Sequence, residues 1–397
     1  MRVLIIFFIT LFTLAEDYFP GENWETASAE EVGLAESKVA ELFEMTFEDD
    51  ATMSAILIKD GYIVYEKYAD GFDQNSFGTS WSTAKSYYAA LIGISLDRGE
   101  IDSLDDPVSK YVESYLTPEK ENITIRQILN MTSGLEFPSH EHEMMFLEAD
   151  HVKYAEKVGV ENPPGEVFQY NNVNSMMIGE ILKGATGKTA KVLLDERIFS
   201  QIGLEDYTAW EDSAGNTMTY CCLDMSARDY SKFGLLFNRD GRWKDKQIIS
   251  KNYVDESLQL YWGATPDMGW SNSDTRGYSL QWWISKYDDD AKIYNTSGKF
   301  GQFIFIDKER DVVFTRITKY RPSEGDVQKW GALGYLRFLG SINRALVVSR
   351  FLMDLGLIKL DDGSVSTPYT TADGESKEFY ENYVEIIDRM ADLEKDG

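Results

Sequence analysis

The chain has 397 residues, of which 43% are hydrophobic and 13% aromatic, and this composition is that of a globular protein rather than a disordered one. Its 67 acidic residues outnumber the 39 basic ones, which gives a formal net charge of −28. Nucleic acids and anionic membrane surfaces would repel such a chain, so neither is expected as a partner. We interpret the excess of carboxylates as a surface that favours solubility.

The first residues have the pattern of a secretory signal peptide. Arg2 precedes an apolar run from Val3 to about Leu14, and the small residue Ala15 follows. This run is shorter than the roughly 20 apolar residues that a membrane-spanning helix needs. We therefore expect cleavage near Ala15, no stable membrane insertion afterwards, and a periplasmic or secreted protein. The alternative is an uncleaved N-terminal anchor.

The next elements are a helix and a hairpin. The pattern indicates a helix at roughly 28–47, followed by two β-rich runs that turn at Asp60-Gly61. Asp-Gly between two such runs is a strong hairpin signal. A helix that contains Ser82 and Lys85 follows, and it is apolar almost all round, which predicts a buried central helix.

From about 102 to 218 the chain is mostly helical and rich in loops. The stretch "RDYSKFGLLFNRDGRW" then predicts an amphipathic helix with a turn at Asp240-Gly241. Two β-rich runs at 302–306 and 312–317 predict a second hairpin, and a long amphipathic helix is expected at about 330–355.

These elements indicate an α/β (α+β) fold, in which an antiparallel sheet is built from both ends of the chain and flanked by helices. We expect a signal peptide at 1–15 and one large domain at 16–360, with a mostly helical lobe at about 96–218 inserted into it. The acidic stretch 361–397 is expected to be a loosely attached tail. A cleft between two lobes is a natural place for a site.

The stretch "SWSTAKSYYAAL" places Ser82 and Lys85 three residues apart. Positions three apart lie on one face of a helix, so the Lys amine can reach the Ser hydroxyl. Burial disfavours the ammonium form, so a neutral Lys can act as the base for a Ser nucleophile. The backbone N–H of the same Ser can hold an oxyanion. The alternative is a helix capped by Ser80 or Ser82, with Lys85 extended to solvent.

The stretch "QYNNVNSMMIGEIL" contains Tyr170 and Asn172 in a Tyr-x-Asn pattern. A Tyr beside a Lys can pass a proton to a leaving group, and an Asn amide can orient the substrate. The same pattern recurs at Tyr380 and Asn382, where we interpret it as chance. The alternative for Tyr170 is a loop aromatic that covers the following helix.

In "NTSGKFGQFIFI", two glycines, Gly298 and Gly301, precede an apolar strand. Glycine allows a ligand to approach the backbone of an edge strand closely, and the N–H of Lys299 could then donate to a substrate carbonyl. The alternative is an ordinary strand entry that contains glycine.

The order of these segments resembles the serine β-lactamase and penicillin-binding-protein superfamily, in its β-lactamase-related hydrolase branch. That branch includes class C β-lactamases, esterases and 6-aminohexanoate-dimer hydrolases. The resemblance extends over most of residues 50–320 and includes the stretches "ILIKDGYIVYEKYADG", "ITIRQILNMTSGLEF" and "RDYSKFGLLFNRDGRW". It implies a β-lactamase/transpeptidase-like fold, and "SGKFGQ" is most similar to the 6-aminohexanoate-dimer hydrolase side.

The resemblance also implies roles for residues. Ser82 would be the acylated nucleophile, Lys85 its general base, and Tyr170 the group that passes a proton to the leaving group. The N–H groups of Ser82 and Lys299 would form the oxyanion hole, and no metal or organic cofactor is implied. The implied substrate-binding residues are Asn172, Thr296, Ser297, Gly298, Gly301 and Gln302.

One departure from the family pattern concerns the substrate. The third motif of the superfamily commonly begins with Lys or His, whose cation helps to hold a substrate carboxylate, whereas Thr296 stands there in this chain. This favours a small ester or amide without that carboxylate over a β-lactam or a D-Ala-D-Ala substrate. β-Lactamase or carboxypeptidase activity is kept as an alternative, and the oligomeric state is open.

Three other interpretations of the sequence differ from this one. The chain lacks Gly-x-Ser-x-Gly, which disfavours a Ser-His-Asp hydrolase. His140, His142 and His151 lie in one acidic stretch, which could bind a metal but is better interpreted as a mobile polar loop. A relative that has lost turnover could be a non-catalytic peptidoglycan-binding protein.

The adjacent Cys221 and Cys222 are not expected to join separate segments.

Overall fold

The computed structural model describes residues 17–21, 23–136, 145–146, 148–262, 277–287, 292–319 and 377–395. The predicted signal peptide and the helix expected at about 330–355 lie outside these residues, as do His140 and His142. Within the described ranges, no helix combines the length and the apolar character needed to cross a membrane.

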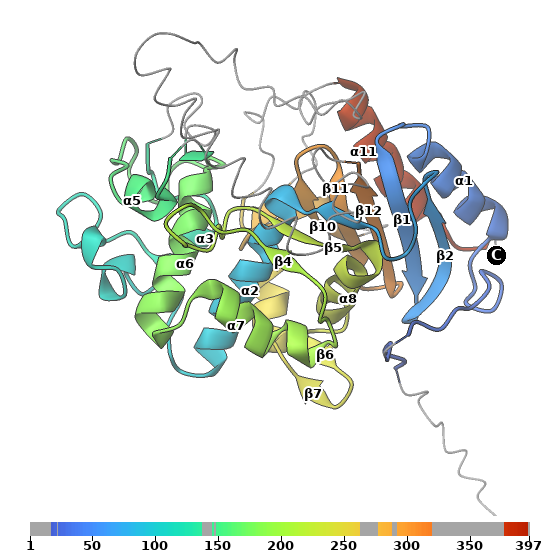
Figure 1. Ribbon diagram of the computed structural model, residues 1–397, viewed down its shortest axis with the longest axis horizontal. Coiled ribbons are helices and arrows are strands. Elements are labelled where there is room, and N and C mark those ends of the chain that lie inside the picture. Colours follow the sequence, from blue (N-terminus) through green and yellow to red (C-terminus); the bar gives the residue numbers. More distant parts are fainter. Residues whose placement is uncertain are drawn as a thin grey trace, which may run out of the picture.

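A seven-stranded antiparallel sheet forms the centre of one half of the molecule (Figure 1). Its order is β2-β1-β12-β11-β10-β9-β8. The strands are β1 (Thr52–Lys59), β2 (Tyr62–Tyr68), β8 (Gly277–Ser279), β9 (Trp282–Tyr287), β10 (Lys292–Gly298), β11 (Gln302–Asp307) and β12 (Val312–Thr318). Because β1 pairs with β12, the sheet joins early and late parts of the chain, as predicted.

Both predicted hairpins are confirmed. β1 and β2 pair antiparallel, and the turn between them uses positive φ at Asp60 (54°) and Gly61 (88°). This backbone is the one that Asp-Gly favours in a two-residue hairpin. β11 and β12 form the second hairpin.

Helices cover both faces of the sheet (Figure 1). The helices α1 (Glu36–Thr46) and α11 (Lys377–Ala391) lie on one face, and α8 (Ala227–Asn238) lies on the other. Successive side chains of β1 alternate accordingly, since Leu57 packs with the α1 and α11 cluster and Ile58 with the α8 cluster.

The other half is mostly helical, as predicted. Its central helix is α2 (Ala84–Asp97), which is buried on nearly every side and packs against α6 and α7. Short strands form a three-stranded sheet of order β3-β5-β4 and a β6–β7 pair. The remaining elements are α3 (Ile125–Leu129), α5 (His151–Ala155), α6 (Asn172–Thr186), α7 (Ala190–Arg197), α9 (Lys251–Ser257), β3 (Phe77–Thr79), β4 (Thr208–Ala209), β5 (Leu223–Ser226), β6 (Arg242–Trp243) and β7 (Lys246–Gln247).

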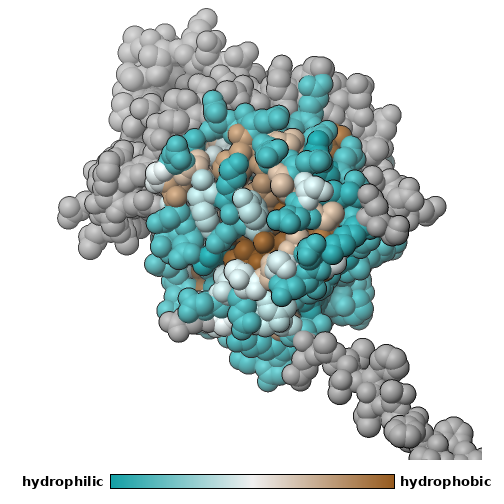
Figure 2. All heavy atoms as spheres, turned by 90° about the vertical axis from the view of Figure 1, so that its right-hand side faces the viewer, coloured by the Kyte–Doolittle hydropathy of each residue, from teal (hydrophilic) through white to brown (hydrophobic). Residues whose placement is uncertain are grey.

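Within the acidic C-terminal stretch, the described residues 377–395 differ from the loose tail that the composition suggests. Its helix α11 buries Tyr383, Ile386, Ile387 and Met390 against α1 and the sheet. These four residues recur at the spacing of one helix face, so the amphipathic pattern holds the segment on the core despite its charge. Figure 2 views the molecule from this side, where hydrophilic side chains dominate around a smaller hydrophobic area.

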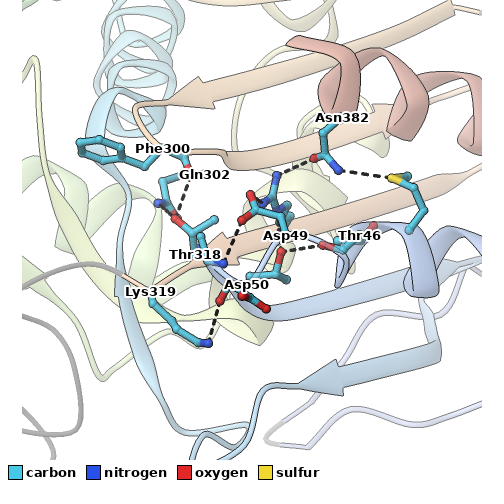
Figure 3. Close-up of polar contacts among 12 residues, drawn as sticks. Thr46, Asp49, Asp50, Phe300, Gln302, Thr318, Lys319 and Asn382 are labelled. Atoms are coloured by element: carbon cyan, nitrogen blue, oxygen red, sulfur yellow. Dashed lines mark hydrogen bonds and ion pairs between the residues drawn. The ribbon is translucent and has the colours of Figure 1, made fainter. Parts of the chain in front are cut away.

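The buried side chain of Arg316 links α11 to the rest of the fold, and Figure 3 labels two of its partners, Asp49 and Asn382. Arg316 on β12 forms an ion pair with Asp49, and its Nη1 donates to Asn382 Oδ1 at 2.8 Å. Its Nε also donates to Thr52 Oγ1 at 3.1 Å. Burial lowers the pKa of Arg316, and the Asp49 carboxylate opposes that effect. The Asn382 interpreted above as part of a chance motif is therefore a structural contact.

The two cysteines, Cys221 and Cys222, are bonded to each other. Because they are neighbours in sequence, the bond joins no separate segments, as expected.

Candidate active site

The segment that carries Ser82 is fixed from both sides. Ser80 N–H donates to the Leu223 carbonyl at 2.8 Å, and Leu223 N–H donates to Ser80 Oγ at 2.7 Å. On the other side, Thr83 Oγ1 donates to the Gln302 carbonyl at 3.1 Å. Ser82 lies between these anchors in a short 3-10 turn (Trp81–Thr83) that leads into α2, and it keeps partial exposure.

Trp81, immediately before Ser82, has an unusual backbone. Its φ is 46°, and a left-handed conformation costs a non-glycine residue about 1–2 kcal/mol. Its indole is 9% exposed and contacts the rings of Phe146 and Phe300, with centroids 6.2 and 5.5 Å away. This packing holds the turn, and such strained positions often occur at functional sites.

Lys85 lies within hydrogen-bond distance of Ser82. Its Nζ lies 2.7 Å from Ser82 Oγ and donates to the Tyr220 carbonyl at 2.6 Å. The side chain is 2% exposed, and burial lowers the pKa of Lys85 well below its ordinary value. A neutral amine that donates to Tyr220 O can direct its lone pair at the Ser82 hydroxyl, which is the arrangement of a general base and a nucleophile.

Tyr170 lies beside this pair. Lys85 Nζ is 5.1 Å from the centroid of the Tyr170 ring. That ring stacks on Trp283 at 5.7 Å and meets Tyr278 edge-on at 6.2 Å. Asn172 begins α6, is 7% exposed, and its Oδ1 has no hydrogen-bond partner within the described structure. A buried acceptor of this kind is suited to a substrate N–H.

The end of β10 packs directly on the Ser82 turn. The register between β10 and β9 ends at Asn295 opposite Trp283, so the segment 296–298 is paired with β11 alone. β10 is thus an interior strand of the sheet. Its C-terminal end, however, has a neighbouring strand on one side only, as the sequence suggests. Thr296 Oγ1 lies 3.4 Å from Thr83 Oγ1, and Ser297 is partly exposed.

The turn after β10 contains the remaining predicted residues. Lys299 is partly exposed, with its Nζ 5.4 Å from the Phe300 ring, and Gly301 has a φ of 91°. Gln302 is fully buried, and its side-chain amide binds Thr318 on β12 (Figure 3). The side chain of Gln302 is therefore engaged within the protein, although it was predicted to contact substrate.

Gly298→Ala is expected to slow the reaction of Ser82. A Cβ at this position would lie 2.2 Å from the Ser80 carbonyl oxygen. Either the turn that carries Ser82 or strand β10 must therefore move. A small displacement of reacting groups can cost about 10–100-fold in rate. The rate of covalent labelling by a fluorophosphonate would measure the effect. Gly21→Ala, where nothing lies within 4 Å, is the control, and equal rates in both variants would contradict the prediction.

His151 does not lie in the polar loop expected for it. It is the first residue of α5 and is 1% exposed, so that expectation is wrong for this residue. The described residues contain no group of three or more His, Cys, Asp or Glu placed to hold a metal ion. Sequence reasoning also missed Tyr220, which lies 135 residues from Lys85 in the chain and belongs to no periodic pattern.

The chain is similar to known proteins. The family model described as Beta-lactamase matches residues 45–336. The 6-aminohexanoate-dimer hydrolase of Paenarthrobacter ureafaciens is 21% identical over 313 residues, which cover 73% of this chain and 78% of that protein.

Solved structures show the same fold. A Bacillus anthracis protein described as a 6-aminohexanoate-dimer hydrolase matches with a TM-score of 0.64 and 20% identity, over 81% of this chain and 88% of that one. EstCE1, described as a hydrolase with promiscuous acyltransferase activity, matches with a TM-score of 0.57 and 13% identity, over 71% and 92%. With its β-lactamase/transpeptidase-like fold, the chain belongs to the Beta-lactamase family, whose members are typically serine hydrolases.

Proposed function

We propose that the protein hydrolyses a small ester or amide through an acyl-enzyme on Ser82. The observation that carries this proposal is the 2.7 Å approach of Lys85 Nζ to Ser82 Oγ, with the Lys buried and its pKa lowered. A charged Lys would be expensive at such a position, whereas a neutral one is a competent base.

The proposed reaction has two halves. Lys85 takes the proton of Ser82 Oγ, which attacks the substrate carbonyl carbon to give a tetrahedral oxyanion. The N–H groups of Ser82 and Lys299 are proposed to hold that oxyanion. Tyr170 then passes a proton to the leaving alcohol or amine, and an acyl-Ser82 ester remains. Water, deprotonated by the same groups, attacks the ester, and the carboxylic acid product leaves with Ser82 restored.

The class of substrate is inferred from what lines the site. Thr296 is neutral where the family resemblance places a cation, which favours an ester or amide without a carboxylate at that point. The Oδ1 of Asn172, which lacks a hydrogen-bond partner among the described residues, can accept from an amide N–H. The names of the relatives support the same class, since they include a 6-aminohexanoate-dimer hydrolase. The apolar N-terminus supports the further proposal that the protein is exported to the periplasm or secreted.

The test uses the wild-type protein and Ser82→Ala. A fluorophosphonate adduct is located by mass spectrometry, and turnover is measured with p-nitrophenyl butyrate, a short linear amide and a chromogenic cephalosporin. We expect the adduct on Ser82, and ester or amide turnover that disappears in Ser82→Ala.

Other outcomes would redirect the assignment. Turnover of the cephalosporin alone would favour a β-lactamase. An adduct on another residue, or unchanged turnover in Ser82→Ala, would refute Ser82 as nucleophile. An unreactive wild-type protein would favour a non-catalytic binding role.

A further inference from the structure

The carbonyl that holds Lys85 belongs to a residue outside regular secondary structure. Tyr220 lies in a turn between β4 and β5, and its carbonyl accepts from Lys85 Nζ at 2.6 Å. The N–H of Cys221, which belongs to the same peptide group as this carbonyl, donates to the Met218 carbonyl at 3.1 Å. The contacts of the Tyr220 ring act on the position of the acceptor in addition to this backbone hydrogen bond.

The Tyr220 ring is held by a buried imidazole. The Tyr220 hydroxyl lies 3.1 Å from His151 Nδ1, and the two residues are 0% and 1% exposed. Phe146 packs edge-on against the Tyr220 ring, with centroids 5.1 Å apart, and also contacts the His151 ring. Burial raises the pKa of Tyr220 well above its ordinary value, so the phenol keeps its proton and forms a neutral hydrogen bond with Nδ1.

His151 is itself fixed by charged groups. Its backbone N–H donates to Asp212 Oδ2 at 2.8 Å, and Asp150 caps the helix that His151 begins. Asp212 is 6% exposed and also accepts from Asn216 Nδ2 at 2.9 Å. Burial lowers the pKa of His151, while the carboxylates of Asp212 and Asp150 oppose that effect. The contacts thus run without a break from Asp212 through His151 and Tyr220 to Lys85.

We infer that His151 and Tyr220 form a buried positioning pair, which holds the Tyr220 carbonyl so that Lys85 stays in line with Ser82. This inference rests on the proposed function. Tyr220 contacts Lys85 Nζ through its backbone carbonyl, and His151 contacts the Tyr220 hydroxyl, so both residues act through Lys85. The acceptor orients the amine, and the orientation decides whether the lone pair of Lys85 points at the Ser82 hydroxyl.

The test compares Tyr220→Phe with Tyr115→Phe in the full-length protein. Tyr115 is also fully buried, and its hydroxyl has no hydrogen-bond partner within the described structure, so it is a matched control. The rate of Ser82 labelling by a fluorophosphonate is measured against pH. We expect Tyr220→Phe to slow labelling by at least about 10-fold and to move the midpoint of the pH profile upward, because a less constrained amine is better solvated as ammonium. Tyr115→Phe is expected to change neither.

A second pair of variants separates positioning from folding. His151→Gln keeps a group that can accept from the phenol, whereas His151→Leu does not, so Gln is expected to retain several-fold more labelling rate than Leu. In ester hydrolysis, kcat should fall while KM stays nearly constant. Equal pH profiles for Tyr220→Phe and Tyr115→Phe, with a reactive wild type, would overturn the positioning pair alone. A wild type whose Ser82 does not react would instead overturn the proposed function on which the pair depends.

Discussion

Lys85→Met is expected to reduce the labelling rate of Ser82 by about 10²–10⁴-fold, the usual contribution of a general base. Met fills a similar volume but cannot accept a proton, so the Ser82 hydroxyl would keep its own. In the wild type, labelling should rise as the pH rises through the folded-state pKa of Lys85, which burial lowers well below the ordinary value. That rise should be absent from Lys85→Met. If Lys85→Met keeps the wild-type labelling rate and pH profile, Lys85 is not the general base.

The same substitution is expected to stabilise the fold near neutral pH. The unfolded chain binds the Lys85 proton more tightly than the folded protein does, because the folded-state pKa is lowered. The free energy of unfolding therefore increases as the pH rises from the folded-state pKa of Lys85 toward its ordinary value. Below that range the folded protein carries the cost of burying a charged Lys85, and Met removes this cost. Lys85→Arg is the matched control, since it keeps a charge at a site that is 2% exposed and should lower both activity and stability. Chemical denaturation at several pH values would measure both variants.

Asp49→Ala is expected to lower the free energy of unfolding by about 3–5 kcal/mol, because it leaves a buried cation without its counterion. Arg316 is 1% exposed, and its other acceptors among the described residues, Thr52 Oγ1 and Asn382 Oδ1, are uncharged. Because Asn382 lies on α11, the C-terminal helix should also become more accessible to protease. Urea unfolding and limited proteolysis would measure the two effects.

The double variant Asp49→Ala/Arg316→Met distinguishes two causes of the lost stability, which are an unpaired buried charge and the loss of packing. Replacing a buried ion pair by apolar groups is often nearly neutral, so the double variant should recover much of the stability lost in Asp49→Ala. If the double variant is as unstable as the sum of the single ones, the contribution of the pair is packing rather than charge compensation.

Much of the fold was determined by local sequence. The Asp60-Gly61 turn, the β11 and β12 runs, and the amphipathic α8 follow from spacing and turn chemistry that act over a few residues. The pairing of Ser82 with Lys85 is equally local, because a helical turn brings positions three apart together. The helical face of α11 was also present in the sequence, but the acidic composition of the segment obscured it.

Only the tertiary structure decided what surrounds the nucleophile. The Tyr220 carbonyl, the ring of Tyr170 on Trp283, and the contact of Gly298 with Ser80 all join segments far apart in the chain. Their residue types carry no signal of these partners, because packing selects a contact by shape and distance rather than by sequence spacing. The burial of His151 was decided in the same way. By itself the sequence placed Ser82 and Lys85, the proposed nucleophile and base, three residues apart, whereas the fold specified how Lys85 is desolvated and oriented.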